Sequence, residues 1–129
     1  MRVLVVLGTS AGGVGNHVHG LVGSLSGAGH HVVVACPPEV DTHFALHEVA
    51  AAVVPLELSD RPHPARDGRA VRDLGRLVAG ADVVHAHGLR AAAVAVLAVG
   101  RAPVPVVATL HNAAPSGALL EVCPLGQRV

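Results

Sequence analysis

The sequence predicts an α/β fold: a Rossmann-like, doubly wound and mostly parallel sheet with helices on both faces. Short apolar runs rich in β-branched residues, such as RVLVVL at 2–7, alternate with segments whose apolar residues recur every three or four positions. The short runs are apolar throughout, which is typical of strands buried on both faces. An alternation of such strands with helices predicts a parallel sheet.

The first half of the chain begins with a strand at 2–7, followed by the Gly-rich break GTSAGGVGN and a helix. The helix carries an apolar face made of Val14, Val18, Leu21, Val22 and Leu25. Glycines in the segment GAGH end it, and HHVVVAC at 30–36 forms the second strand. THFALHEVAA at 42–51 predicts a short helix, and AVVPLEL at 52–58 predicts a third strand that Pro55 interrupts.

The second half continues the alternation. SDRPHPARDG at 59–68 is polar and contains proline, so we expect a loop there. RAVRDLGRLVAG at 69–80 predicts a second amphipathic helix, and ADVVHAHG at 81–88 a fourth strand. LRAAAVAVLAVG at 89–100 predicts a largely buried helix. VPVVATL at 104–110 predicts a fifth strand, with proline at its start, where a missing N–H does least harm.

The last residues do not continue this pattern. AAPSGALLEVCPLGQRV, at 113–129, holds no convincing helix and little apolar periodicity. We therefore expect one Rossmann-like domain over residues 1–112 and an atypical tail over 113–129. An open α/β domain usually goes on through another helix and strand, so we expect the chain to be a fragment of a longer architecture.

Composition excludes several classes of protein. Of the 129 residues, 51% are hydrophobic and 14% are charged, which excludes a disordered chain. The formal net charge of +0 gives no basic surface for nucleic acid. Cys36 ends an apolar run, as a buried thiol in a reducing compartment does. The N-terminal apolar run is too short for a signal peptide, so we expect a cytoplasmic protein.

The Gly-rich break lies where open α/β sheets bind ligands, between the carboxyl end of a strand and a helix. Gly12, Gly13 and Gly15 let the backbone approach a ligand, and free N–H groups at the start of the helix favour a phosphate or another anion. Ser10 and Asn16 are placed to cap the helix or to contact that ligand. The glycine spacing does not fit the dinucleotide fingerprint G-x-G-x-x-G. A plain turn between strand and helix is the alternative interpretation.

Ten histidines raise the question of a metal site. His17 and His19 lie two residues apart on the first helix, so they point in different directions. His85 and His87 lie two apart on a strand, so they can share one face. Because no cysteine or carboxylate accompanies them at a zinc-like spacing, we expect no metal.

Three segments together resemble the N-terminal domain of family-four glycosyltransferases of the GT-B fold. They are AGGVGNHVHGLVGSLSGAGHHVVVACP, ADVVHAHGLRAAAVA and PVVATLHN. The shared features are a double glycine with a following helix and a GHxV strand, a D-V-V-H-x-H strand end, and a T-x-H strand end. The resemblance covers residues 1–112, with the three motifs in the family's order.

This resemblance implies a hexosyltransferase-like activity: retaining transfer of a sugar from a nucleotide sugar to an acceptor, with no cofactor and generally no metal. In the family two Rossmann-like domains face each other across a cleft. The N-terminal domain mainly binds the acceptor, and the C-terminal domain, which is missing here, holds the nucleotide sugar. We therefore expect little or no activity from this chain alone.

By the same resemblance, His111 of the T-x-H motif is the catalytic residue at the reaction centre. A neutral imidazole there can hydrogen-bond a sugar hydroxyl or a developing phosphate charge. A strand-end histidine that only satisfies backbone groups is the alternative. The expected substrate-binding residues are Gly12, Gly13, Gly15, Asn16, His87 and Asn112.

The expected partners are a nucleotide-sugar donor, a glycosyl acceptor and the missing C-terminal domain. The alternative function is a non-catalytic Rossmann-like module for a nucleotide or a partner subunit. A third possibility is a sugar-nucleotide epimerase, which shares the two-domain architecture. The charged residues of the helix at 69–80 and just before it are expected to form a solvated face. Peripheral contact with an anionic membrane, which would place the protein at the inner membrane surface, is the alternative for that face. These residues are Arg66, Arg69, Arg72, Asp73 and Arg76.

Overall fold

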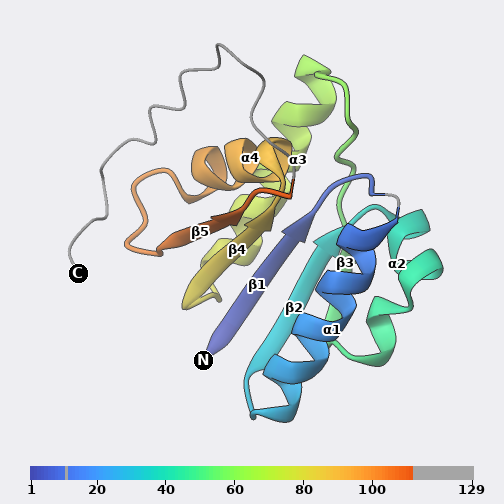
Figure 1. Cartoon of the computed structure of the whole chain (residues 1–129). Helices are drawn as coiled ribbons and strands as arrows, with labels where there is room; N and C mark the ends of the chain where they lie inside the picture. The colour runs from blue at the N-terminus through green and yellow to red at the C-terminus, as the bar shows by residue number, and fades with distance from the viewer. Residues whose placement is uncertain (11, 112–129) are drawn as a thin grey trace.

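A single parallel sheet organises the chain in the computed structural model, which describes residues 1–10 and 12–111 (Figure 1). All neighbouring strands pair in parallel, in the order β3-β2-β1-β4-β5. The α/β fold with interleaved helices is therefore the one that the sequence predicts. The strands are β1 (Arg2–Leu7), β2 (His31–Cys36), β3 (Ala52–Pro55), β4 (Val83–His87) and β5 (Val106–Thr109).

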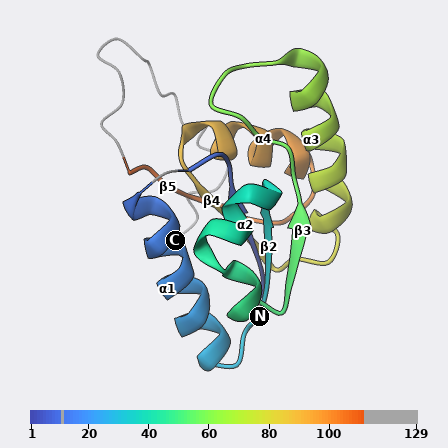
Figure 2. The same cartoon turned by 90° about the vertical axis from the view of Figure 1, so that its right-hand side faces the viewer.

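Helices cover both faces of this sheet. On one face lie α1 (Gly13–Gly27) and α2 (Pro38–Phe44), the latter followed by a single turn of 3-10 helix at Leu46–Glu48. On the other face lie α3 (Pro64–Val78) and α4 (Leu89–Val99), as Figures 1 and 2 show. The sheet is thus the middle of three layers, and its central strand β1 is covered from both sides.

The apolar core is divided by β1 into two clusters. Val3 and Val5 point toward α1 and α2, whereas Leu4 and Val6 point toward α3 and α4. All four are at most 5% exposed. Since successive side chains of a strand point to opposite faces, only an apolar run without alternation can fill both clusters. The run RVLVVL does so, with Val3 paired to Val32 of β2 and to Val83 of β4.

Helix α3 begins earlier than the sequence pattern predicts. The prediction of a loop over 59–68 is wrong from Pro64 onward, where the first helical turn starts. Proline at this position keeps the helical φ and lacks only an N–H that would be unpaired anyway. The ring Nδ1 of His63 accepts a hydrogen bond from the backbone N–H of Arg66, 3.3 Å away, and so caps the helix.

The segment between β2 and β3 also differs from its prediction. The expected helix at 42–51 is wrong in its bounds, because α2 spans Pro38–Phe44 and then stops. Ala45 adopts a φ of 51°, the left-handed conformation that ends helices. The third strand is shorter than the expected 52–58, since β3 ends at Pro55. Its remaining apolar residues are buried in the coil that follows the strand.

Helix α4 is buried on one side only, so the prediction of a largely buried helix is wrong for its outer side. Ala91 and Ala95 are at most 1% exposed and belong to the core cluster. Val96 and Leu97 are 55% and 67% exposed. The apolar sequence has no period that distinguishes the two sides. None of the described helices combines the length and hydropathy that crossing a bilayer requires.

An arginine of α4 ties the coil before α3 to the two helices. The guanidinium of Arg90 donates to both carboxylate oxygens of Asp67, at 2.8 and 3.0 Å, and to the backbone carbonyls of Ser59 and Arg61, at 3.1 and 3.2 Å. The side-chain hydrogen bond from Arg90 holds the pKa of Asp67 below its usual value. A planar fork of five donors satisfies four acceptors at once, which the single ammonium group of lysine does not.

We expect Arg90→Ala to lower the free energy of unfolding by about 1–2 kcal/mol, because its charge-assisted hydrogen bonds are lost. In the variant, water replaces Arg90 as the hydrogen-bond donor to the backbone carbonyls of Ser59 and Arg61. Chemical denaturation measures this change. Arg72→Ala is the matched control, because Arg72 lies 3.9 Å from Asp73 and its side chain is 65% exposed. The control should stay within about 0.5 kcal/mol of the parent. Equal effects of the two variants would show that the hydrogen bonds of Arg90 do not stabilise the fold.

Candidate functional site

The predicted site residues that the structure describes lie at the carboxyl end of the sheet or at the start of α1 beside it. Leu7 pairs with His87, and His87 pairs with Thr109, so the ends of β1, β4 and β5 lie next to one another. Helix α1 begins beside them, a few residues after β1 ends (Figure 1). A parallel sheet brings all of its carboxyl ends to one edge, which is where such sheets bind ligands.

Two glycines open the start of α1 toward solvent. Gly12 is the N-cap, with a φ of 75° that favours glycine over any other residue. A Cβ placed on Gly12 or Gly13 would have no atom within 4 Å among the described residues. No side chain of the described residues caps α1, and its first turn contains no acidic residue. The first N–H groups of α1 are therefore unopposed by negative charge, which favours an anion.

Gly15 has a packing role. A Cβ on this residue would lie 2.2 Å from the ring of Phe44, so only glycine lets α1 approach the end of α2 this closely. Gly15 is buried, whereas Asn16, the next residue of α1, is exposed. Asn112, the last of the sequence-predicted substrate-binding residues, lies outside the described residues.

Four histidines from three elements meet at this edge. His87 of β4 lies with its ring centroid 5.4 Å from that of His111, which follows β5. His85 lies on the same face of β4, with its ring centroid 4.3 Å from that of His87. His17 of α1 meets both His87 and His111 edge-on, at 5.9 and 5.4 Å. We call these four residues the histidine cluster.

His17 and His85 belong to the cluster but are not among the site residues that the sequence motifs predict. His17 follows the exposed Gly13 by one helical turn, so the two share the side of α1 that faces the sheet end. That spacing was the available signal. His19 points elsewhere, as its spacing from His17 predicts, and its Nδ1 lies 2.8 Å from the carbonyl oxygen of Phe44.

The inner histidines of the cluster are held neutral by their surroundings. Burial lowers the pKa of His87 to about 4, and the neighbouring imidazoles of His85, His111 and His17 act in the same direction. Burial also lowers the pKa of His85, with smaller contributions from His17 and His111. Near neutral pH these two rings are therefore uncharged and each presents one donor and one acceptor.

Hydrogen bonds fix the rings within the cluster. His85 Nε2 lies 2.8 Å from the hydroxyl oxygen of Thr109, and His87 Nδ1 lies 3.1 Å from His111 Nε2. Both contacts join β4 to β5 or to the residues that follow it. The position of His111 is thus set by β4, and its ring lies on the same edge as Gly12 and Gly13.

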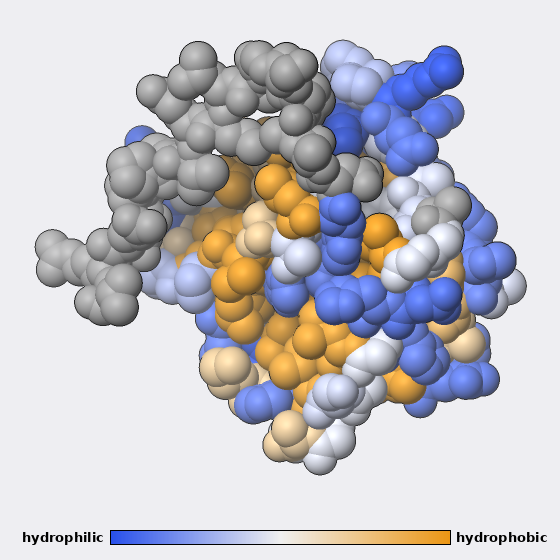
Figure 3. Space-filling view, viewed as in Figure 1, coloured by the Kyte–Doolittle hydropathy of each residue, from blue (hydrophilic) through white to orange (hydrophobic). Residues whose placement is uncertain are grey.

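The sheet face that carries His85 and His87 is open near β5. Val107, the partner of His85 in the β4–β5 ladder, is 49% exposed. Figure 3 shows apolar surface over the middle of the sheet beside α1. Neutral imidazoles, an uncapped helix start and adjoining apolar surface suit a ligand that carries hydroxyl or phosphate oxygens on an apolar body. In residues 1–10 and 12–111, no group of three or more His, Cys, Asp or Glu is placed to hold a metal ion.

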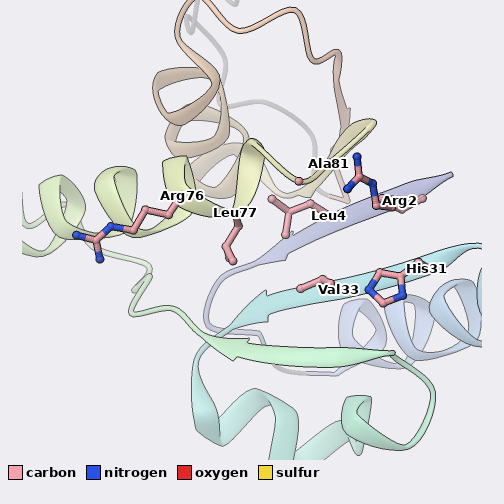
Figure 4. Close-up of a pocket in the computed structure, with 9 residues that line it drawn as sticks. Arg2, Leu4, His31, Val33, Arg76, Leu77 and Ala81 are labelled. Carbon is pink, nitrogen blue, oxygen red and sulfur yellow. The ribbon is translucent and has the colours of Figure 1, made fainter.

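A hollow of about 320 Å³ lies at the opposite end of the sheet from the histidine cluster. It is formed by the starts of β1 and β2 and by the end of α3, with Leu4, Val33 and Leu77 among its lining residues (Figure 4). In Figure 4 the side chain of Arg76 points away from the other labelled residues. The hollow lies at the amino ends of the strands, whereas open α/β sheets bind their ligands at the carboxyl ends.

Comparison with known proteins identifies what this fold and edge resemble. The family model described as "Glycosyl transferase 4-like domain" matches residues 12–128. The comparison with curated proteins gave no match.

Solved structures give the same fold. A glycosyltransferase from Rickettsia africae superimposes with a TM-score of 0.69 at 15% identity, over 89% of this chain and 31% of that one. The glycosyltransferase of kitacinnamycin superimposes with a TM-score of 0.55 at 18% identity, over 83% of this chain and 29% of that one. The chain therefore spans about a third of the length of these two structures.

Proposed function

Because the chain belongs to the glycosyl transferase 4-like domain family, we propose that it is the N-terminal, acceptor-side domain of an enzyme that transfers a sugar from a nucleotide sugar to an acceptor. The transfer proceeds with retention of configuration at the sugar. His111 contacts the sugar or the acceptor at the reaction centre, and Gly12 and Gly13 line the cleft near the donor diphosphate.

One observation carries this proposal: the open glycines at the start of α1 and the ring of His111 lie at the same edge of the sheet. His17, one turn after Gly13, lies 5.4 Å from His111 between ring centroids and connects the two features. A diphosphate at the start of α1 gains from the unopposed N–H groups there. A sugar next to it comes within reach of the neutral imidazoles.

The donor nucleotide is held by a second domain. The relatives of known structure are about three times as long as this chain, which supports a division of the cleft between two domains. We expect this polypeptide alone to turn over no nucleotide sugar, and we place the enzyme in the cytoplasm, where the buried thiol of Cys36 stays reduced. Robust turnover when the isolated chain is mixed with nucleotide sugars and acceptors would contradict the two-domain part of the proposal.

His111→Ala tests the site. Introduced into an intact enzyme in which this domain is joined to a donor-binding domain, the substitution should lower kcat at least tenfold, about 1.4 kcal/mol of transition-state stabilisation, because a hydrogen bond at the reaction centre is lost. His31→Ala is the matched control: His31 is an exposed histidine of the same sheet, at the first residue of β2 and thus at the opposite edge. Unchanged kinetics of the His111 variant would remove His111 from the site.

A further inference from the structure

His87 is buried and contacts His111, and its burial limits which of its ring nitrogens can carry a proton. Its side chain is 3% exposed, and its Nδ1 lies 3.1 Å from Nε2 of His111. Its other ring nitrogen, Nε2, is buried and has no hydrogen-bond partner among the described residues. A buried polar atom without a partner is uncommon in folded proteins, so its protonation state has consequences.

The contact between the two rings has the geometry of a hydrogen bond. Their planes differ by 20°, and their centroids are 5.4 Å apart. This separation is about as large as a 3.1 Å distance between two ring nitrogens permits, so the nitrogens lie on the line between the centroids. The N–H bond and the lone pair of an imidazole lie in the ring plane. Two rings joined nitrogen to nitrogen in nearly parallel planes therefore share one proton in a near-linear hydrogen bond.

Two arrangements of that proton are available to a neutral pair. In the first, His87 Nδ1–H donates to His111 Nε2, which leaves a bare lone pair on the buried His87 Nε2. In the second, His111 Nε2–H donates to His87 Nδ1, which leaves a buried N–H on His87 Nε2 with no acceptor among the described residues. A buried N–H without an acceptor is rarer in native structures than an acceptor with an unused lone pair. The first arrangement is therefore favoured.

We propose that His87 is a positioning residue that holds the proton of His111 on Nδ1, so that His111 faces the sheet edge as a hydrogen-bond donor. In this arrangement His111 donates to an oxygen of the bound molecule and does not accept a proton from it. That the oxygen belongs to a sugar or its phosphate rests on the proposed function; the position of the proton rests only on the contact between the two rings. His87 acts through His111 and needs no contact with substrate.

The neighbouring histidines leave this assignment in place. His85 already shares a hydrogen bond with the hydroxyl of Thr109 through its Nε2. His17 approaches both rings edge-on and makes no hydrogen bond to either among the described residues. No carboxylate forms a hydrogen bond or ion pair with His87 or His111 within the described chain that would draw the proton to another nitrogen.

The experiment is a nitrogen–proton correlation spectrum of the imidazole rings in the isotopically labelled chain at pH 7.5, which reports which nitrogen of His111 carries the proton. We expect the Nδ1–H form of His111 in roughly tenfold excess, which corresponds to about 1.4 kcal/mol. His87→Leu removes the donor and should bring the Nε2–H form to a comparable population. His87→Asn places an amide N–H near the former Nδ1 and should restore the excess.

Controls separate this role from a general loss of structure. His17→Leu removes an imidazole that lies equally close to His111 but is not bonded to it, and should leave the proton on Nδ1. The backbone amide spectrum of each variant reports whether the sheet is intact. A proton on Nε2 of His111 in the parent, or the same spectrum in the leucine and asparagine variants, would overturn the inference. The measurement uses no sugar, so failure of the transferase assay alone would contradict only the proposed function.

Discussion

Gly15→Ala is expected to lower the free energy of unfolding by about 3 kcal/mol, which is the largest effect on stability that we predict for a single substitution. The added Cβ would lie 2.2 Å from the ring of Phe44, which is 7% exposed. A rigid aromatic ring inside a packed cluster cannot move aside as the end of a flexible chain does, so either α1 or α2 must shift. Chemical denaturation of the parent and of the variant, monitored by circular dichroism, measures the difference.

Gly20→Ala is the matched control for this change. Gly20 lies in the same helix, is exposed, and has no atom within 4 Å of an added Cβ. There the substitution should raise the free energy of unfolding by about 0.5–1 kcal/mol, because alanine loses less backbone freedom in a helix than glycine does. The two alanine variants should therefore differ in sign. A Gly15 variant as stable as the parent would show that α1 and α2 are not in contact through Gly15.

Acid is expected to destabilise the protein by about 3 kcal/mol through His87 alone. The pKa of His87 is lowered by burial from 6.5 to about 4 in the folded chain. Between these two values the unfolded chain binds a proton that the folded chain excludes, so stability is complete above pH 6.5 and is lost progressively as the pH falls to 4. A difference of this size in pKa corresponds to about 3 kcal/mol.

The pH dependence of the unfolding free energy between pH 6.5 and 4 measures this contribution. His87→Leu should be less stable than the parent at pH 7.5, where it loses the hydrogen bond to His111, but its stability should fall less steeply with acid, by close to one proton. His87→Asn, which also lacks a titrating group, should show the same shallow slope. Parent and variant curves with identical slopes would contradict the burial of a neutral His87.

The strands were predictable because their signal is local. The run at 2–7 is observed as β1 without change, and the expected strand at 30–36 begins one residue later, at His31. An uninterrupted apolar run rich in β-branched residues has few other stable environments in a globular fold. The α/β class and the parallel pairing of the strands follow from the same alternation.

The errors lie where solvated segments carry no period. The first turn of α3 contains Pro64, Arg66 and Asp67, residue types that are common in loops, and only the cap by His63 identifies the helix. The sequence also gives no sign that Ala45 adopts the left-handed conformation that ends α2, since alanine is a strong helix former.

The histidine cluster shows the corresponding limit for the site. His87 and His111 were assigned from their motifs, and their neighbouring strands made proximity foreseeable. His17 belongs to α1, and its approach to both rings depends on how that helix packs against the sheet. No spacing along the chain encodes this distance, because it results from tertiary packing.

The central position of β1 also dictates an order of events on the ribosome. Val3 finds its first neighbour, Val32, soon after β2 emerges, but its second, Val83, is synthesised much later. Until then Leu4 and Val6 have only part of their final surroundings, since α3, β4 and α4 complete that cluster. Because β4 pairs with β1 last, the nascent chain passes through an intermediate in which one edge of β1 is unpaired and one face of the sheet exposes apolar side chains. Such a species exposes the kind of apolar surface that holdase chaperones bind.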